Sequence, residues 1–293
     1  MPELPEVETV MQGLAPVMTG ARIVEIELRR PNLRFPLPAG MPERLAGRRI
    51  EALGRRAKYI LIHLDGADIL TVHLGMTGRF TIGGEATTVA EAAFTHGAGR
   101  DHRHDHVVIH LSNGAVVTFN DARRFGYMSL LTAQELPFHK YFKNLGVEPL
   151  SDDLTPDYVA ERASARRVDL KSFLMDQRVI AGLGNIYVCE ALWRSRLKPT
   201  RCAQTIATAK GKPRVSAVAL VDSVRGVLQD AIAAGGSSLR DYVQVNGQLG
   251  YFQKAHAVYN REHQSCLRSS CSGIVRRVVQ GGRSTFYCPR CQQ

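Results

Sequence analysis

The chain has 293 residues, and 44% of them are hydrophobic, which is typical of a globular protein long enough for two domains. No apolar run approaches the roughly 18 residues of a membrane span, and the N-terminus lacks the basic-then-apolar pattern of a secretory signal. We therefore expect a cytoplasmic protein without a membrane partner. The net charge of +11 and the pI near 9.6 predict a polyanionic partner, nucleic acid above all.

The first predicted element is a helix that begins near Pro5 in the opening MPELPEVETV. Proline suits the first helical position, and Glu6 falls in the first turn, where the helix dipole favours negative charge. One apolar face follows at helical spacing, made of Val7, Val10, Met11, Leu14 and Met18. From this pattern alone, the stretch is a well-started amphipathic helix, and only the rest of the chain favours a chemical role for its end.

Residues 20–130 are predicted to form a β-rich domain, either a sandwich or a barrel. The segments ARIVEIEL, RRIEALGRRAKYILIHL, DILTVHLGMTGRF and DHVVIHLSNGAVVTF contain β-branched runs of strand length. The sequence Ser112-Asn113-Gly114 predicts a hairpin turn. Gly83 to Arg103 is small and polar, and we expect a surface loop there.

Four histidines close to this loop suggest a metal site as an alternative; they are His96, His102, His104 and His106. No carboxylate or cysteine spacing completes such a site. A polar loop that leads into a strand is the interpretation we favour.

The second half of the chain is predicted to be helical after a linker at residues 131–150. Thr155 and Pro156 have the residue types of a helix cap and a first helical position. The predicted helices are Tyr158–Arg166, Leu170–Asp176, Tyr187–Arg196 and Ser216–Ala234. Between the second and third, Gly182 and Gly184 allow close backbone approach, and Asn185 could donate to a phosphate at the start of the next helix. A plain glycine-containing turn between two helices explains the same residues.

The last 28 residues hold four of the six cysteines, in the pattern C-x4-C, sixteen residues, C-x2-C; they are Cys266, Cys271, Cys288 and Cys291. Two close pairs separated by a loop can hold one tetrahedral Zn²⁺. Metal binding would contribute about 10–16 kcal/mol to folding a segment too small for its own core. His263 could replace a ligand only if a cysteine were missing. We predict one structural zinc, whose hairpin could present Arg276, Arg277 and Arg283 to phosphates.

Six motifs in chain order resemble the bacterial formamidopyrimidine-DNA glycosylases. They are PELPEVET, GRRAKYI, HLGMTG, DARRFG, LMDQRVIAGLGNIY and RSTFYCPRCQ. The related endonuclease VIII branch usually has glycine where Leu4 stands, so Leu4 favours the formamidopyrimidine branch. The resemblance implies an α+β fold with a catalytic helix-and-β-sandwich domain, a helix–two-turn–helix domain and a β-hairpin zinc finger. We place these at residues 1–130, 151–256 and 257–293.

The resemblance also implies a bifunctional DNA glycosylase and AP lyase of base excision repair. Pro2 becomes the N-terminus once Met1 is removed, and its amine would attack the sugar of an oxidised purine nucleotide, such as 8-oxoguanine or a formamidopyrimidine. An α-amino group with a pKa near 8 is about a tenth unprotonated at pH 7, unlike a lysine. Glu3 would act as acid and base, Glu6 would position groups and move protons, and Lys58, which we place in a strand, would contact the phosphate beside the lesion.

Duplex DNA with an oxidised base or an abasic site is the implied partner of a monomeric enzyme. The flipped-out base would leave a gap filled by Met76, Arg123 and Phe125. Taken alone, Met76 and Phe125 would be assigned to core packing and Lys58 to the solvated surface. The full predicted set of DNA-contacting residues is His73, Met76, Arg123, Phe125, Lys171, Asn185 and Arg283. Lys171 and the segment Ser237–Tyr251 are expected near the extruded base.

The chain departs from the family pattern at three places. The first cysteine pair encloses four residues, LRSS, where two are usual, and we expect a distorted knuckle that still binds zinc. Ala122 replaces a proline in the DARRFG turn, and Asn260 takes a position that favours a left-handed backbone. Two alternatives stay open, namely the sister activity on oxidised pyrimidines and a non-catalytic zinc-containing protein that senses DNA damage.

Overall fold

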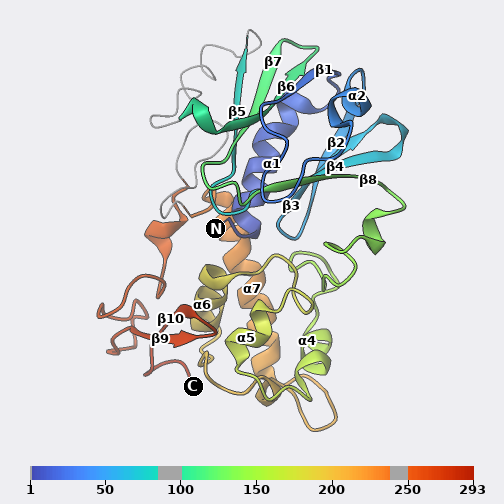
Figure 1. Cartoon of the computed structure of the whole chain (residues 1–293). Helices are drawn as coiled ribbons and strands as arrows, with labels where there is room; N and C mark the ends of the chain where they lie inside the picture. Colours follow the sequence, from blue (N-terminus) through green and yellow to red (C-terminus); the bar gives the residue numbers. More distant parts are fainter. Residues whose placement is uncertain (1, 85–100, 238–249) are drawn as a thin grey trace. The chain divides into compact units, whose positions relative to one another are not determined.

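The computed structural model describes residues 2–84, 101–237 and 250–293. The chain divides into two compact units. The first contains Met1–Lys143 and Ala234–Gln253, and the second contains Asn144–Ala233 and Lys254–Gln293. The elements of each unit are labelled in Figure 1. The domain boundaries drawn from the sequence stay a prediction.

The first unit is built on α1 (Leu4–Met18), which confirms the predicted N-terminal helix. Glu3 is its N-cap, with an extended backbone at φ −101° and ψ −170°. The backbone N–H of Glu3 donates to Glu6 Oε2 at 2.8 Å, which is the reciprocal half of a capping box. Val7, Val10, Leu14 and Met18 are buried, so the apolar face read from the sequence points into the core.

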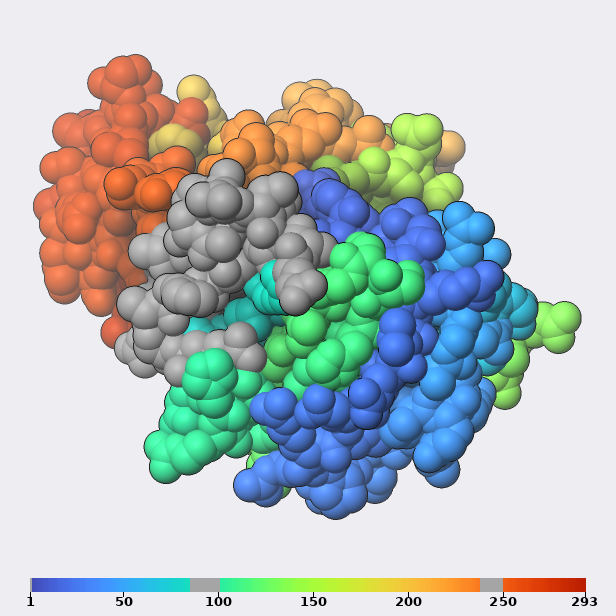
Figure 2. Space-filling view, turned by 90° about the horizontal axis from the view of Figure 1, so that it is seen from above, coloured from blue at the N-terminus to red at the C-terminus, as the bar shows by residue number. Residues whose placement is uncertain are grey.

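Two four-stranded antiparallel sheets complete the β-sandwich. In spatial order, the first sheet contains β1 (Ile23–Leu28), β6 (Asp105–Leu111), β7 (Ala115–Asn120) and β5 (Arg79–Gly84). The second contains β2 (Ile50–Arg56), β3 (Tyr59–Leu64), β4 (Asp68–His73) and β8 (Tyr127–Thr132). Figure 2 shows blue N-terminal residues beside green ones, and β1 pairs with β6 in the first sheet. One hydrophobic cluster joins α1 to both sheets.

Several short elements of this unit were absent from the sequence prediction. They are α2 (Met41–Leu45), η1 (Asp65–Ala67), η2 (His102–His104) and η3 (Leu136–Phe138). The predicted loop at 83–103 was partly wrong, because Gly83 and Gly84 pair with Val116 and Ala115 as the end of β5. Residues 85–100 of that loop, with His96, lie outside the described residues.

The second unit contains four α-helices among the described residues. They are α4 (Pro156–Ala163), α5 (Leu170–Met175), α6 (Asn185–Arg194) and α7 (Val215–Ala233), with η4 (Ala203–Ile206) before α7. Thr155 caps α4 by accepting the N–H of Tyr158 at 3.0 Å, which confirms the predicted start. The helix ends three residues before the predicted Arg166. Ser164 makes the last helical bond, to Ala160, and the N–H of Arg166 then bonds Ala163 at 2.9 Å in a tighter turn.

The cysteine-rich tail forms a hairpin of β9 (Arg276–Gln280) and β10 (Arg283–Tyr287), and η5 (Phe252–Ala255) precedes it. Val258, Val275 and Phe286 pack with Cys189 of α6 in a small hydrophobic cluster. The tail therefore rests on a helix of its own unit. Within the three described ranges, no helix is long and apolar enough to cross a membrane.

Candidate active site and zinc finger

The N-terminal end of α1 holds Pro2 and Glu3 in the interior of the first unit, where both residues are buried. Glu6 is 2% exposed, and its two carboxylate oxygens accept different backbone N–H groups. Oε2 takes the N–H of Glu3 and Oε1 takes that of Ser237, each at 2.8 Å. Glu6 thus ties the helix start to a residue 231 positions away in the chain. No sequence spacing could have predicted this contact.

Lys58 lies in the tight turn between β2 and β3, so its predicted placement in a strand was wrong. Arg56 pairs with Tyr59 across the ladder, which leaves Ala57 and Lys58 as a two-residue hairpin loop. Ala57 has a φ of 53°, a left-handed conformation that costs an alanine about 1–2 kcal/mol. The turn lacks the glycine or asparagine that is typical of such loops, and for this reason the sequence predicted one continuous strand. The side chain of Lys58 is 9% exposed.

An ion pair missed by the sequence analysis joins this hairpin to α1. Arg55 Nε donates to Glu8 Oε2 at 2.7 Å, and the two side chains are 9% and 17% exposed. Arg55 Nη1 also donates to the carbonyl of Ala57 at 3.0 Å, across the turn that carries Lys58. Arg55 therefore connects the turn of Ala57 and Lys58 to the second turn of α1, the helix whose N-cap is Glu3.

The three predicted gap-filling residues lie on two turns joined by one carboxylate. Asp121, which is fully buried, accepts the hydroxyl of Thr77 and the N–H of Gly126, the second at 2.7 Å. Thr77 in turn accepts the N–H of Arg123 at 3.1 Å. The turn of Met76 and the turn of Arg123 and Phe125 are thereby brought together. Sequence reasoning missed Asp121, although its place in DARRFG beside a glycine was a usable turn signal.

Close backbone contact reinforces this junction. Gly75 has a φ of 65°, and a Cβ there would lie 2.3 Å from the carbonyl carbon of Phe125. No side chain can be accommodated at that distance, so the HLGMTG motif needs a glycine at this position. The guanidinium of Arg123 lies 4.6 Å from the ring centre of Phe125, which is 40% exposed. Phe125 therefore does not have the core-packing role considered from the sequence.

His73 lies at the end of β4, where its ring stacks on Tyr127 at 4.8 Å and 9°. Its Nδ1 accepts the N–H of Gly75 at 3.0 Å, so the ring helps to set the Met76 turn. Burial, followed by the positive charges of Lys58 and Arg34, lowers the pKa of His73 to about 4. The ring is consequently neutral at pH 7, and we expect it to position neighbouring groups rather than to contribute a positive charge.

In the second unit, Asn185 begins α6, and its amide nitrogen donates to the carbonyl of Ser284 at 2.9 Å. A longer contact of 3.4 Å reaches the hydroxyl of Tyr259. Its Oδ1 is buried and has no hydrogen-bond partner among the described residues. The side chain predicted to hold a phosphate thus connects the helix to β10.

Lys171 is 1% exposed within α5, and its Nζ donates to Thr285 Oγ1 of β10 at 2.7 Å. Glu190 of α6 accepts three consecutive backbone N–H groups before the hairpin, from Ala257, Val258 and Tyr259, at 2.8–3.0 Å. Burial raises the pKa of Glu190. The sequence analysis missed Glu190, which lies outside the six motifs. Helix side chains therefore hold both the hairpin and the chain that leads into it.

Arg283 begins β10 and is exposed beside the turn of Gly281 and Gly282, which have φ values of 54° and 73°. Arg276 and Arg277 of β9 are exposed as well. Asn260 has the expected left-handed backbone, with a φ of 59°. The segment Ser237–Tyr251 was also predicted to lie near the extruded base, but its residues 238–249 lie outside the described residues.

The four cysteines converge as the sequence predicted, with all sulfur atoms within 4.8 Å of one another. The sulfurs of Cys266 and Cys291 are 3.8 Å apart, and those of Cys271 and Cys288 are 3.7 Å apart. A tetrahedron with Zn–S bonds of about 2.3 Å requires sulfur separations of about 3.8 Å, so the donor set fits one Zn²⁺. The C-x4-C spacing therefore keeps the ligand set, and His263 and the described histidines at 102–106 take no part in it.

Trp193 of α6 was not singled out from the sequence, although it is the only tryptophan of the chain. Its Nε1–H donates to Cys266 Sγ at 3.4 Å. Arg268, within the widened knuckle, lies 4.7 Å over the Trp193 ring and donates from Nη2 to the Trp193 carbonyl at 2.8 Å. The knuckle that is two residues longer than usual therefore contacts the end of α6 directly, through Arg268.

Comparisons with known proteins match this arrangement over the whole chain. The family model of the formamidopyrimidine-DNA glycosylase N-terminal domain matches residues 1–128, and that of the H2TH domain of the same enzyme matches residues 145–243. A zinc finger found in FPG and IleRS matches residues 264–293. The chain belongs to the formamidopyrimidine-DNA glycosylase family. It is a DNA-repair glycosylase and AP lyase, with a structural zinc held by its four clustered cysteines.

Individual relatives agree with this membership. The formamidopyrimidine-DNA glycosylases of Azorhizobium caulinodans and Sinorhizobium fredii are 55% and 52% identical, and each match covers 100% of both chains. The complex of Lactococcus lactis Fpg with abasic-site DNA is 28% identical at a TM-score of 0.84. A complex of a mutant of that protein with Fapy-dG-containing DNA is 29% identical at 0.83, and both structures cover 100% of each chain. The predicted family, fold class and zinc are confirmed.

Proposed function

We propose that this enzyme excises oxidised purines, formamidopyrimidines and 8-oxoguanine, from duplex DNA and then cuts the strand at the resulting abasic site. The relatives whose structures contain Fapy-dG and abasic-site DNA support the substrate class. The observation that carries the proposal is the buried Pro2-Glu3 pair at the start of α1 in a chain of this family. We further propose that it acts as a monomer in the cytoplasm, where bacterial DNA lies.

The proposed reaction begins when the damaged nucleotide is flipped out of the duplex. After removal of Met1, the Pro2 nitrogen bonds to C1′ of the sugar, and the bond from C1′ to the base breaks. The base leaves with the bonding electron pair and takes up a proton, and the Pro2 nitrogen loses its own proton, which restores its lone pair. The sugar C1′–O4′ bond then opens, O4′ is protonated, and an iminium links Pro2 to C1′. This cation acidifies the neighbouring protons of the sugar.

Strand cleavage follows from that acidity. Loss of a C2′ proton expels the 3′ phosphate by β-elimination, and a second elimination at C4′ expels the 5′ phosphate. Water then hydrolyses the iminium and frees Pro2. The zinc supplies fold stability only, and no step of the reaction passes through it.

The two glutamates are assigned different tasks in this proposal. Glu3, the N-cap beside Pro2, carries the proton to and from O4′. Glu6 has both oxygens on backbone N–H groups, which favours positioning of the helix start as its main task. The positive end of the α1 dipole disfavours a protonated amine on Pro2 and so favours the nucleophilic form at neutral pH.

The remaining predicted residues would hold the DNA. Lys58 would approach the phosphate beside the lesion from its hairpin turn. Met76 and Phe125 would fill the gap left by the extruded base, while Arg123 would donate to the orphaned partner base. Asn185, Arg283 and Lys171 belong to the second unit, and there Arg283 is the exposed side chain. We propose direct phosphate contact for Arg283, and support of the neighbouring backbone for Asn185 and Lys171.

Borohydride trapping tests the reaction. The zinc-loaded enzyme is incubated with duplexes containing 8-oxoguanine opposite cytosine, a formamidopyrimidine or an oxidised pyrimidine. A matched variant keeps the Pro2 nitrogen in a peptide bond through an uncleaved N-terminal extension. We expect a covalent protein–DNA band on the two purine lesions that disappears in the blocked variant.

The other outcomes separate the alternatives. A band on the oxidised-pyrimidine duplex alone would assign the enzyme to the sister activity. A band that persists in the blocked variant would remove Pro2 as the nucleophile. Tight lesion binding without any band would leave a damage-sensing protein.

A further inference from the structure

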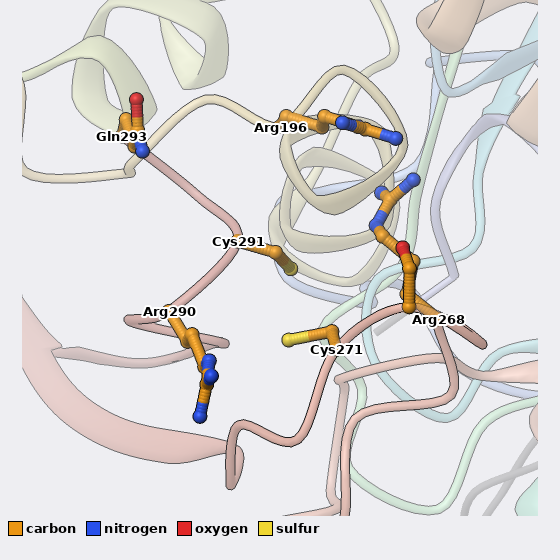
Figure 3. Close-up of a pocket in the computed structure, with 7 residues that line it drawn as sticks. Arg196, Arg268, Cys271, Arg290, Cys291 and Gln293 are labelled. Carbon is orange, nitrogen blue, oxygen red and sulfur yellow. The ribbon is translucent and has the colours of Figure 1, made fainter.

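A basic pocket lies beside the zinc cysteines, and its lining residues are not among those assigned to the reaction. Its volume is about 310 Å³, and it is lined by Arg196, Arg268, Ser270, Arg290 and two of the zinc ligands, Cys271 and Cys291. Figure 3 shows the three arginines and the two cysteines at this pocket. The volume is at the lower end of small-ligand sites, which run from roughly 300 to 1,000 Å³. A small ligand suits this space.

The guanidinium groups in this pocket lie beside zinc ligands, and Arg268 donates to the sulfur of Cys291. Arg196 and Arg268 point toward each other, whereas Arg290 points away from them (Figure 3). Among the described residues, none of the three forms an ion pair with a carboxylate. A zinc with four thiolates carries a charge of −2, so three guanidiniums leave the pocket with a net positive charge. Two converging guanidiniums repel each other unless an anion lies between them.

Gln293 also lines the pocket, and its carbonyl oxygen is already hydrogen-bonded. The carbonyl oxygen of Gln293 accepts the N–H of Lys198 and an N–H of Arg201, both at 2.9 Å. The donors in both hydrogen bonds, Lys198 and Arg201, do not line the pocket.

Of the two converging arginines, Arg268 is held in place by the protein, and Arg196 is exposed. Arg268 donates to the Trp193 carbonyl and stacks on the Trp193 ring, so its guanidinium is fixed before any ligand arrives. Arg196 follows α6 with a φ of 62°, at a position after a helix end where glycine is usual. Ser270 adds a hydroxyl donor from the same widened knuckle as Arg268. A pre-organised donor such as Arg268 favours binding, because less side-chain freedom is lost.

We propose that Arg196 and Arg268, with Ser270, form a phosphate-binding site beside the zinc cysteines, built from residues that take no part in base excision. The forked N–H donors of arginine match the oxygens of a phosphate better than those of other small anions of one charge. The phosphate can come from the backbone of the bound DNA, outside the lesion contacts, or from a free phosphate ion. This site does not depend on the chemistry proposed for Pro2.

The substitution Arg196→Gly separates binding from folding. It removes a guanidinium from the site, and it places the preferred residue at a left-handed position, so the melting temperature is expected to stay equal or to rise. Lys210→Gln is the charge control, because Lys210 is exposed in the same unit and does not line the pocket.

The first measurement is a titration of the zinc-loaded, full-length enzyme with inorganic phosphate at constant ionic strength, followed by the arginine side-chain N–H signals in NMR. The second is the salt dependence of binding to an undamaged duplex. Each DNA phosphate contact contributes about 0.9 to the slope of log K against log salt concentration. A DNA phosphate in the pocket therefore predicts a slope lower by about 1 in Arg196→Gly and unchanged in Lys210→Gln.

Two results support the site and identify the source of the phosphate. A saturable phosphate response that weakens at least tenfold in Arg196→Gly, with an unchanged salt slope, assigns a free phosphate. A reduced salt slope assigns the DNA backbone. The proposal is overturned if wild type and Arg196→Gly show the same phosphate response and the same slope. Because the trapping assay depends on Pro2, its failure would leave these measurements unaffected.

Discussion

The buried carboxylate of Asp121 accepts the backbone N–H of Gly126 at 2.7 Å and fixes the turn on which Arg123 and Phe125 lie. Its other oxygen accepts the Thr77 hydroxyl from the turn of Met76. The three side chains proposed to replace the flipped base therefore depend on one residue that touches no DNA in the proposal. We therefore expect a substitution at Asp121 to displace these side chains and to change how well the enzyme distinguishes the base opposite the lesion.

We expect Asp121→Asn to destabilise the enzyme by about 2–3 kcal/mol, since an amide nitrogen would face a buried donor. Excision of 8-oxoguanine opposite cytosine and opposite adenine should then become more alike, and their kcat/KM ratio should move toward one. Both are measured below the melting temperature of the variant. Asp152→Asn is the control, since Asp152 is exposed. If the variant is destabilised but the kcat/KM ratio is unchanged, Asp121 contributes to folding only.

The Glu8–Arg55 pair should couple α1 to the hairpin that carries Lys58. The side chains are 17% and 9% exposed and meet at 2.7 Å, so solvent screens them only in part. A double-mutant cycle with Glu8→Gln and Arg55→Gln, read by urea unfolding, should give a coupling energy of about 1–2 kcal/mol. Each single variant should also slow excision, through a displaced Lys58 turn.

The matched comparison for that cycle is Arg194 with Asp230, which also meet at 2.7 Å but are 33% and 58% exposed. Exposed pairs contribute about 0.2–1 kcal/mol. Equal coupling energies for the two pairs would show that burial adds nothing at Arg55 and would contradict the prediction.

Stability should fall in mild acid because of His73. Its pKa is about 4 in the folded state, lowered by burial and then by Lys58 and Arg34, against about 6.5 when unfolded. Below pH 6.5 the unfolded chain therefore binds more protons, so the free energy of unfolding decreases as the pH falls from 6.5 toward 4. This group alone should account for about 2–3 kcal/mol between pH 7 and pH 4.5.

His73→Gln should remove that share, and urea unfolding at pH 7 and pH 4.5 measures it as a difference between the two proteins. His263→Gln is the control, with an imidazole that is 89% exposed. His256, whose pKa burial also lowers to about 4, is present in every variant and cancels in the comparison. Parallel pH profiles for wild type and His73→Gln would contradict the pKa assignment.

Periodicity and turn signals predicted the elements that depend on local sequence. The apolar face of α1, the strands on either side of Asn113-Gly114 and the Thr155 cap of α4 were all found where expected. The cysteine cluster was also predictable, because ligand spacing is local within each pair. The two-residue turn at Ala57 and Lys58 was not, since it carries no glycine or asparagine.

The contacts that assemble the site could not be read from spacing. Glu6 reaches Ser237 across 231 positions, and Lys171 reaches Thr285 across 114. The helix pattern assigned Glu6 only to the first turn, and the family resemblance predicted a role for each residue without its partners. The sequence analysis missed Asp121, Arg55 and Glu190. The role of a buried polar side chain depends on its hydrogen-bond partners, and these can be distant in the sequence.

Trp193 should slow the loss of zinc from the finger. Its Nε1–H donates to Cys266 Sγ at 3.4 Å, and such hydrogen bonds around metal ligands typically contribute a factor of about 10–100 in metal affinity. Trp193→Phe keeps an aromatic ring beneath Arg268 but removes the donor. We expect zinc transfer to a chelator to become about tenfold faster. Tyr158→Phe is the matched control, since it removes one aromatic hydrogen bond of 2.8 Å, to the Val179 carbonyl in the same unit. Equal rates of zinc release in the two variants would mean that the indole N–H does not stabilise the thiolate, and that Trp193 contributes only its contact with Arg268.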